Sequence, residues 1–458
     1  MKKRTLALAL TAALALSLLG AAALAAEGGS PGPDSSAAQS AGEAPQAEDS
    51  SLPEDISLPE DRSGPPAEET GPAEEPTQTY IPDPVGSISF ANLESRMREG
   101  SLSLLALEEQ IQVLESIDYD EMKEDIRKGL NEIANQQWQM ISMGSSLGPM
   151  GSLVTAAPLQ SLQSAYDSTR KTFDDIKEGK LQKDNGDIIR QLENAQNQVV
   201  MAGETLYIAL LDMERSAQGL DRQLTALDRT LEELELRYEL GHISSQTLKQ
   251  TQAGRTSLVS GQQTLDSNID TYKMQLELLI GAELTGNIRL GALPQVTAAQ
   301  LGEMDLEADL SAAKEASYSL YSAKLTLNDA EEEFKDKGKE YNHNEKNYEY
   351  VMAKHQWQAA QHNYAAAVQN YEMSFRTLYL QVKDCKQVLD AAKTALAVER
   401  DNYAVAQLKQ SQGKLSQNAL LDAEDKVKQA QETVDGASID LFTAYHNYRW
   451  AVDYGILN

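Results

Sequence analysis

Five histidines and two acidic runs carry side chains of the kinds that bind metal ions in proteins. His355 and His362 would share one face of a helix, but neither has a ligand partner at the third or fourth residue along the chain. A metal site on a helix needs such a partner, so we expect no metal site. The acidic runs, Asp118 to Asp125 and Glu331 to Asp336, are more typical of solvated helix faces than of cation sites. The histidines are His242, His343, His355, His362 and His446.

The motifs of common enzymes do not occur in a suitable context. No Ser-His-Asp arrangement, glycine-rich phosphate loop or nucleotide motif lies beside a plausible strand. We therefore expect no catalytic residue, no cofactor and no enzymatic activity. Cys385 is the only cysteine, which excludes an intramolecular disulfide, and we expect it to be a small core residue. The net charge of −30 argues against nucleic acid as a partner and against docking on anionic lipid.

The two regions before Val85 are not predicted to fold. Residues 1–25 resemble a secretory signal peptide, with a basic start, an apolar stretch from Leu6 to Leu19 and a small-x-small cleavage site before Ala26. An uncleaved membrane anchor is the alternative, but the apolar stretch is short for one. Residues 26–84 are acidic and rich in proline, so we expect a disordered linker. Only three of the 14 prolines follow Val85, which allows very long helices there.

The residues after Val85 contain an internal repeat with an offset of 172. Thr205-Leu206-Tyr207 recurs as Thr377-Leu378-Tyr379, and the pattern Gly-x-aliphatic-Ser-x-x-x-Leu occurs once in each copy. An apolar stripe with alternating spacings of four and three also runs through both copies and is broken only at Glu399, which indicates a coiled coil. The stripe comprises Met213, Ala217, Leu220, Leu224, Leu227, Leu231 and Leu234 in the first copy, and Cys385, Leu389, Ala392, Leu396, Glu399, Tyr403 and Ala406 in the second.

Each copy is predicted to be a helix, a tight turn and a second helix. Gly241 and Gly413 can adopt the left-handed conformation that ends a helix. Ser244 and Ser416 can cap the free N–H groups of the helix that follows. The tyrosines at equivalent positions, Tyr207 and Tyr379, are expected to pack in the seam rather than to bind a ligand.

A weaker match upstream shows where the two copies differ. Ser101 to Leu104 resembles Ser317 to Leu320 at an offset of 216, so the first copy holds about 44 additional residues before its turn. Within them Met143 to Pro158, which is rich in Gly, Ser and Pro, and the polar stretch Glu178 to Asp187 are predicted to be loops. The matching crossing of the second copy is expected near Gly338 to Asn344. The predicted organisation after the linker is a first repeat at 85–281, an inter-repeat linker at 282–304 and a second repeat at 305–458.

From Ile88 to Gly455 the sequence resembles the TolC family of outer membrane efflux proteins. The resemblance rests on the duplication, on Tyr238 to Ser244 with Leu248 as the family's turn motif, and on Ile88 to Glu94 as the start of its first helix. It implies a homotrimer whose hairpin helices form a tunnel, with a membrane fusion (periplasmic adaptor) protein and an inner-membrane ABC or RND pump as partners. The implied adaptor-binding residues are Gly241, Ile243, Ser244, Leu248, Gly413, Leu415, Ser416 and Leu420. We expect the aliphatic residue of each turn, Ile243 or Leu415, to be exposed at the end of its hairpin.

One departure from the family concerns its membrane strands. Met143 to Pro158 and the crossing near Gly338 are too short for two strands of about ten residues each. We therefore expect an all-α fold, built from two repeated antiparallel coiled-coil hairpins, with little or no β-barrel. The predicted function is a component of an envelope efflux or export system, acting as a helical duct or an adaptor-docking element. The alternative is an exported coiled-coil structural or surface protein without a conduit. The predicted location is the cell envelope or cell surface.

Overall fold

The structure, a computed structural model, describes residues 83–457, apart from the side chains of Pro149 and Ser152. The predicted signal peptide and residues 26–82 of the predicted linker lie outside the described residues. In the described part of the chain, no helix is both long enough and apolar enough to cross a membrane.

Helices make up nearly all of the described chain, which confirms the all-α class. The first group of helices is α2 (Phe90–Gly100), α3 (Leu102–Glu115), α4 (Tyr119–Ser146), the 3-10 helix η1 (Gly148–Met150), α5 (Gly151–Lys177), α6 (Lys180–Glu239) and α7 (Ser245–Leu279). The second group is α8 (Ala298–Gly302), α9 (Leu306–Ala316), α10 (Tyr318–Glu340), α11 (Tyr348–Ser411) and α12 (Gln417–Tyr454). Two strands of two residues each, β1 (Ser87–Ile88) and β2 (Arg289–Leu290), pair in parallel.

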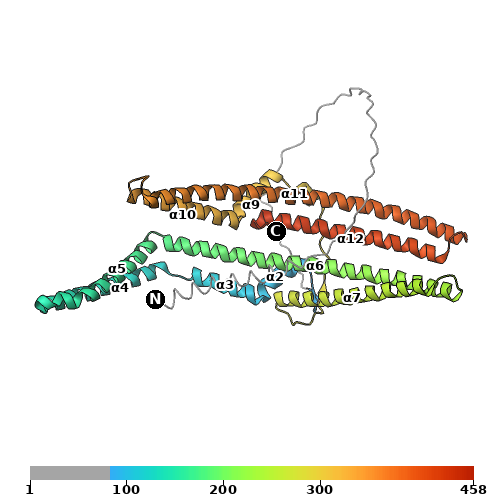
Figure 1. Cartoon of the computed structure of the whole chain (residues 1–458), viewed down its shortest axis with the longest axis horizontal. Coiled ribbons are helices and arrows are strands. Elements are labelled where there is room, and N and C mark those ends of the chain that lie inside the picture. The colour runs from blue at the N-terminus through green and yellow to red at the C-terminus, as the bar shows by residue number, and fades with distance from the viewer. Residues whose placement is uncertain (1–82, 458) are drawn as a thin grey trace, which may run out of the picture. The chain divides into compact units, whose positions relative to one another are not determined.

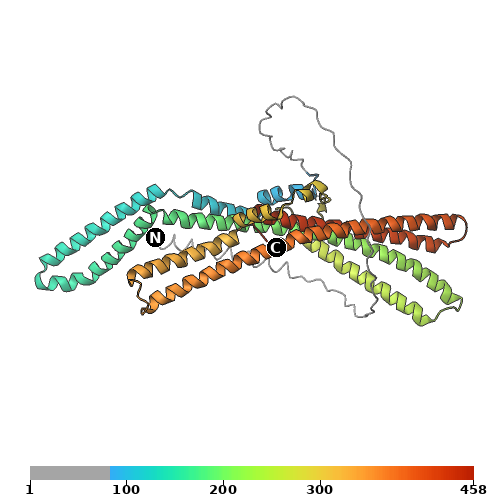
Figure 2. The same ribbon diagram turned by 90° about the horizontal axis from the view of Figure 1, so that it is seen from above.

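The two longest helices are α6, with 60 residues, and α11, with 64. Each pairs with the helix that follows it, so that α6–α7 and α11–α12 form antiparallel hairpins; α4–α5 and α10–α11 also run side by side (Figures 1 and 2). The predicted stripe lies in these contacts, because Leu224, Leu231, Leu389 and Leu396 are all buried. Cys385 is half-buried against the same core as Leu389.

Two helix breaks have the same local geometry. Ser101 separates α2 from α3 and Ser317 separates α9 from α10, and both residues are extended, with φ/ψ of −73/115° and −66/114°. Both serines are buried, and each hydroxyl hydrogen-bonds to the serine two residues further on, at 2.9 and 3.0 Å. The sequence match at offset 216 therefore relates two equivalent bends.

Tyr207 ties the strands to the first hairpin. It is buried, and its hydroxyl donates to the backbone oxygen of Ile88 at 3.0 Å or of Gly291 at 2.7 Å. Tyr379 is half-buried against the core of the second hairpin. Both tyrosines thus pack within the protein, as expected.

The loop predicted at Met143 to Pro158 is wrong. Residues 143–146 complete α4, and α5 begins at Gly151 and continues through Pro158. Of the three glycines in this stretch, Gly148 lies in the turn with a φ of 62°. Gly144 and Gly151 instead let the two helices approach closely, since a Cβ atom at Gly151 would lie 1.8 Å from the backbone oxygen of Gly144. Most of the additional residues of the first copy therefore form a helical hairpin, α4–α5.

The loop predicted at Glu178 to Asp187 is also wrong. Gly179, at φ 75°, makes the break between α5 and α6, and α6 begins at Lys180. The polar residues that suggested a loop are used in packing, because the buried Asn185 donates to the hydroxyl of Tyr119 on α4 at 2.8 Å. The crossing of the second copy lies close to its predicted place, between the end of α10 at Glu340 and the start of α11 at Tyr348.

Candidate functional site at the hairpin turns

The turn between α6 and α7 is built from one glycine and one serine. Gly241 has a φ of 75°. Its N–H donates to the backbone oxygen of Tyr238 at 2.9 Å, and the N–H of His242 donates to the backbone oxygen of Arg237 at 2.8 Å. This is the Schellman arrangement that satisfies the last carbonyls of a helix. Ser244 then caps α7, because its hydroxyl accepts from the N–H of Thr247 at 3.2 Å.

The turn between α11 and α12 repeats this geometry bond for bond. Gly413 has a φ of 70°. Its N–H donates to the backbone oxygen of Gln410 at 2.8 Å, and the N–H of Lys414 donates to the backbone oxygen of Lys409 at 2.9 Å. Ser416 accepts from the N–H of Ala419 at 3.2 Å. The predicted stop and start roles of the four turn residues are confirmed.

The aliphatic residues of the turns are less exposed than the sequence suggested. We expected Ile243 and Leu415 to be exposed, but both are half-buried, as are Leu248 and Leu420 in the helices that follow. A half-buried side chain at a helix end contributes to the packing of the turn itself. These four residues therefore do not form an uncovered apolar surface.

A different matched pair does present apolar surface near the turns. Leu236 is 57 % exposed and Leu408 is 61 % exposed, and each lies five residues before the glycine of its turn. Their separation is the repeat offset of 172, so the same comparison of the two copies could have found them. Tyr238 and Leu240 extend the exposed apolar surface at the first turn.

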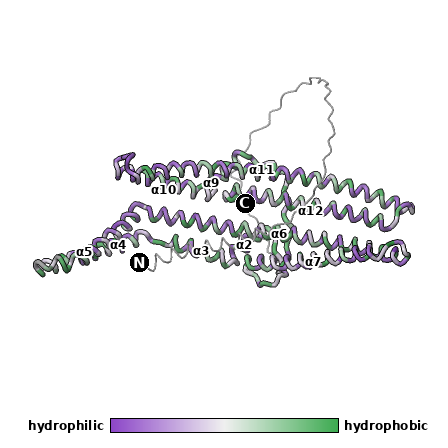
Figure 3. The backbone as a smooth tube through the Cα atoms, viewed as in Figure 1, coloured by the Kyte–Doolittle hydropathy of each residue, from purple (hydrophilic) through white to green (hydrophobic). Residues whose placement is uncertain are grey.

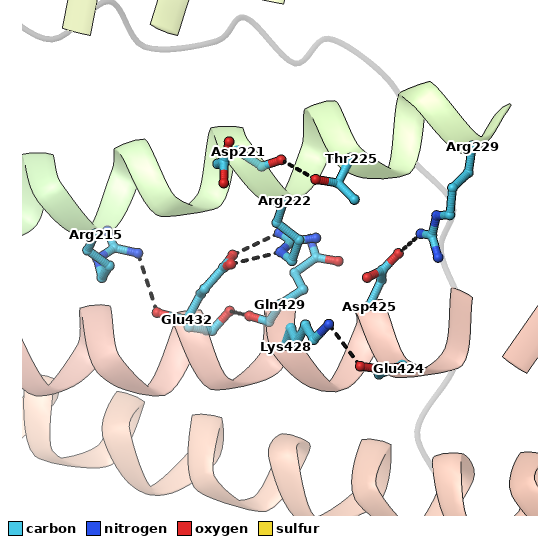
Figure 4. A network of polar contacts seen from close by, with 11 residues as sticks. Arg215, Asp221, Arg222, Thr225, Arg229, Glu424, Asp425, Lys428, Gln429 and Glu432 are labelled. Carbon is cyan, nitrogen blue, oxygen red and sulfur yellow. Dashed lines mark hydrogen bonds and ion pairs between the residues drawn. The ribbon is translucent and has the colours of Figure 1, made fainter. Parts of the chain in front are cut away.

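Ion pairs between α6 and α12 bring the two turns to the same end. Arg222 forms two hydrogen bonds with the carboxylate of Glu432, at 2.7 and 2.8 Å, and Arg229 pairs with Asp425 (Figure 4). Arg215 completes the series by donating to the backbone oxygen of Glu432 at 3.3 Å. The turn after α6 follows its C-terminus, and the turn before α12 precedes its N-terminus. Since the ion pairs align α6 and α12 in opposite directions, the two turns lie at the same end of these helices.

The spacing of the arginines explains why they form a series. Arg215, Arg222 and Arg229 are each seven residues apart, so they lie along one face of α6. Glycines make room for them, since a Cβ atom at Gly436 on α12 would lie 3.2 Å from the Arg215 guanidinium carbon. The positions equivalent to the three arginines in the second copy hold Gln387, Thr394 and Asp401, so this contact is specific to the first copy.

A buried polar cluster also joins α6 to α12. The carboxylate of Glu204 accepts from the indole N–H of Trp450 at 2.8 Å and lies 3.0 Å from Nε2 of His446. The rings of Phe90 and Phe442 pack against His446, with centroid distances of 5.3 and 5.8 Å. With no further acidic residue or cysteine among these contacts, the cluster is suited to holding the helices together.

The remaining chemistry-bearing residues do not converge. Within residues 83–457 no group of three or more His, Cys, Asp or Glu could hold a metal ion. The acidic run on α4 is engaged in local ion pairs with its own lysines and arginine, such as Lys123 with Asp120 at 2.8 Å and Lys128 with Asp125 at 2.9 Å.

Comparisons with known proteins give the following likenesses. No protein-family model matches the chain, and no curated protein matches it in sequence. Among solved structures it is similar to the outer membrane protein VceC from Vibrio cholerae, with 12 % identity and a TM-score of 0.42, over 80 % of this chain and 96 % of VceC. It is similar to CusC, with 15 % identity and a TM-score of 0.45, over 70 % and 96 % of the two chains. It is also similar to the outer-membrane channel OprN, with 13 % identity and a TM-score of 0.44, over 80 % and 90 %.

Proposed function

We propose that the chain is a TolC-like component of an envelope efflux or export system, and that its paired turns bind a membrane fusion protein. The observation that carries the proposal is the pair of turns with matching backbone geometry at the same end of α6 and α12. Each turn has an exposed leucine at the equivalent position, Leu236 or Leu408. A protein that binds both turns would meet the same apolar contact twice.

The contacts between the hairpins support the proposal. Arg222, Arg229 and their partners are largely shielded from water, with side-chain exposures between 16 and 26 %. Together with the Glu204 cluster they hold α6 against α12 along much of the length of α12. One chain therefore presents four helices, α6, α7, α11 and α12, as a unit. We place the two repeats at 85–281 and 305–458, with a linker at 282–304, so that each repeat contributes one of these hairpins.

The family resemblance supplies the assembly. It implies that three copies place twelve such helices around a tunnel. The signal peptide predicted from residues 1–25 would direct the chain to the cell envelope. The membrane fusion protein would connect this duct to an inner-membrane ABC or RND pump. The protein would thus act by binding its partners and enclosing a path, and not by catalysing a reaction.

The mass of the mature chain in solution tests the proposal. A duct requires a closed assembly, so we expect light scattering on the purified protein to give the mass of three chains. The alternative function, an exported coiled-coil structural or surface protein, requires no closed ring. A monomer at all concentrations, in detergent and without it, would rule out the duct and favour that alternative.

A further inference from the structure

The end of the α4–α5 hairpin has no charged residue. Between Glu132 and Asp167 the sequence contains no Asp, Glu, Lys, Arg or His, although 24 % of the whole chain is charged. This stretch includes the C-terminal half of α4, η1 and the N-terminal half of α5.

Large apolar side chains project from this end into the surroundings. Trp138 is 70 % exposed and Leu153 is 77 % exposed, and Figure 3 shows hydrophobic residues around the α4–α5 turn. Exposed apolar surface of this extent marks a site of contact with another apolar phase. The exposed residues are Trp138, Ile141, Met143, Leu147, Met150, Leu153 and Val154.

The same end has almost no core of its own. The hydrophobic cluster of this hairpin contains Ile126, Leu130 and Ile176, all of which lie away from the turn. Among the described residues between Glu132 and Asp167, only Gly151 and Thr155 are buried. A shallow groove of about 530 Å³ lies between the two helices, lined by residues that include Met140, Met143 and Leu162. The ends of α4 and α5 that meet at the turn therefore lack a core of their own, and packing against another surface would stabilise them.

The α10–α11 hairpin end of the same chain provides a contrast. There the exposed surface is densely charged, with ion pairs such as Lys337 with Glu340 at 2.9 Å and Lys354 with Glu345 at 3.1 Å. Both ends are helical and both turn sharply, so the hairpin geometry does not account for the difference. The lack of charge is therefore particular to the α4–α5 end.

We propose that the α4–α5 end inserts into the apolar layer of a lipid bilayer. The exposed residues do not form a single stripe, as they would for a helix packed against one protein face. Trp138 and Met143 are five residues apart and so lie about 140° apart around α4, on well-separated faces. An environment that covers a hairpin from several sides without offering any charge is lipid.

The helical backbone suits this environment, because its polar groups are already hydrogen-bonded within each helix. The uncharged parts of α4 and α5, residues 133–146 and 151–166, are roughly 21 and 24 Å long at about 1.5 Å per residue. The close approach of Gly144 and Gly151 resembles the small-residue contacts that pair helices in lipid. The amide side chains, such as Gln136 and Gln163, lie far from the turn and would be among the headgroups, whereas the hydroxyls of Ser145, Ser146 and Thr155 near the turn already donate to backbone oxygens. Insertion would not depend on anionic lipid.

Vesicle flotation with neutral phosphatidylcholine tests this inference on the mature chain. We expect the wild-type protein to float with the vesicles. Ile141→Glu with Leu153→Glu should lower the ratio of bound to free protein by roughly tenfold or more, because each change places a carboxylate in the apolar layer. The matched control, Tyr348→Glu with Met352→Glu, adds the same charges to exposed apolar positions near the α10–α11 end and should leave flotation unchanged.

Fluorescence provides an independent measurement of insertion. Of the three tryptophans, Trp357 is half-buried and Trp450 is buried, so Trp138 is the one exposed to solvent. Vesicles of brominated phosphatidylcholine should quench the wild-type emission, and Trp138→Phe should abolish this quenching while flotation continues. Absence of flotation by the wild-type protein would overturn the proposal. Equal flotation by the two double variants would also overturn it. So would a protein that forms oligomers without binding vesicles, if Ile141→Glu with Leu153→Glu dissociates those oligomers, because the exposed side chains would then contact other copies of the chain.

Discussion

Arg222 of α6 and Glu432 of α12 are 210 residues apart in the chain and form a two-bond ion pair, with Nε to Oε1 at 2.7 Å and Nη2 to Oε2 at 2.8 Å. The pair is largely shielded from water. The hydrogen bonds that the Arg222 guanidinium donates to Glu432, together with the charge of that carboxylate, raise the pKa of Arg222 against the opposing effect of burial. The pair joins α6 to α12 and so aligns the first hairpin with the second.

Removing the charge from Arg222 should destabilise the contact between the hairpins. Arg222→Met leaves the Glu432 carboxylate shielded and without its partner, which we expect to lower the free energy of unfolding by about 1–2 kcal/mol. Arg237→Met is the matched control, because Arg237 pairs with Glu233 within α6 and both are exposed. An exposed pair of this kind contributes less than about 0.5 kcal/mol. Urea unfolding of the two variants gives the comparison, and equal losses would show that the pair does not stabilise the contact.

Gly100 lies at a backbone contact that a larger residue should disrupt. A Cβ atom at this position would be 2.1 Å from the backbone oxygen of Ile280 at the end of α7. Gly100→Ala should therefore lower the stability by roughly 2 kcal/mol or more, since neither backbone can move freely. Gly261→Ala in α7 meets nothing within 4 Å and should raise the stability by up to about 1 kcal/mol, because alanine is the better helix former. If the melting temperatures of the two variants shifted in the same direction, the close contact would be refuted.

Glu277 should make the stability depend on pH. It is buried, and its carboxylate accepts from the backbone N–H groups of Thr285, Gly286, Asn287 and Ile288 at 2.6–3.2 Å. Burial alone raises its pKa, but the hydrogen bonds, led by that from Gly286, outweigh burial and lower the pKa below its usual value. A lowered folded-state pKa stabilises the protein above the unfolded-state pKa of about 4.3, and this stabilisation is lost as pH falls through the folded value.

The variant Glu277→Gln isolates this contribution. At pH 7 it should unfold about 1–3 kcal/mol more easily than the wild type, because glutamine cannot accept all of these bonds. The difference should shrink as the pH falls below the unfolded-state pKa of about 4.3 and through the lower pKa of the folded wild-type carboxylate. Glu283→Gln, at an exposed position nearby, should show no such trend. A difference that is constant from pH 7 to pH 3 would contradict the assignment.

Features that depend on neighbours along the chain were predictable from the sequence. The spacing of Leu224 and Leu231 predicts the seam because residues seven apart share a face of any helix. Gly241 and Ser244 predict the turn because a left-handed conformation and a free N–H group are local requirements. The all-α class follows from these two signals together with the scarcity of proline after Val85.

Features that depend on distant segments were not predictable in this way. Nothing near Arg222 in the sequence indicates Glu432, because the pairing is set by how two hairpins pack. Gly144 and Gly151 suggested a loop, since the sequence does not distinguish a flexible glycine from one that allows two helices to approach closely. The exposure of Ile243 was also misjudged, because its burial depends on the arrangement of the turn around it.

The turns allow docking and packing to be separated by two double variants. Leu236 and Leu408 are exposed at equivalent positions, so Leu236→Asp with Leu408→Asp should change the stability by less than about 0.5 kcal/mol. If a membrane fusion protein binds there, the same variant should weaken its binding by roughly thirtyfold or more, because a buried anchor contributes about 2 kcal/mol or more to an interface. Ile243→Asp with Leu415→Asp is the packing counterpart, since these side chains are half-buried, and it should lower the melting temperature. Both variants are compared by pull-down with the membrane fusion protein encoded beside the gene and by thermal melting. Normal binding by the Leu236 and Leu408 variant, with its fold intact, would exclude docking at these leucines.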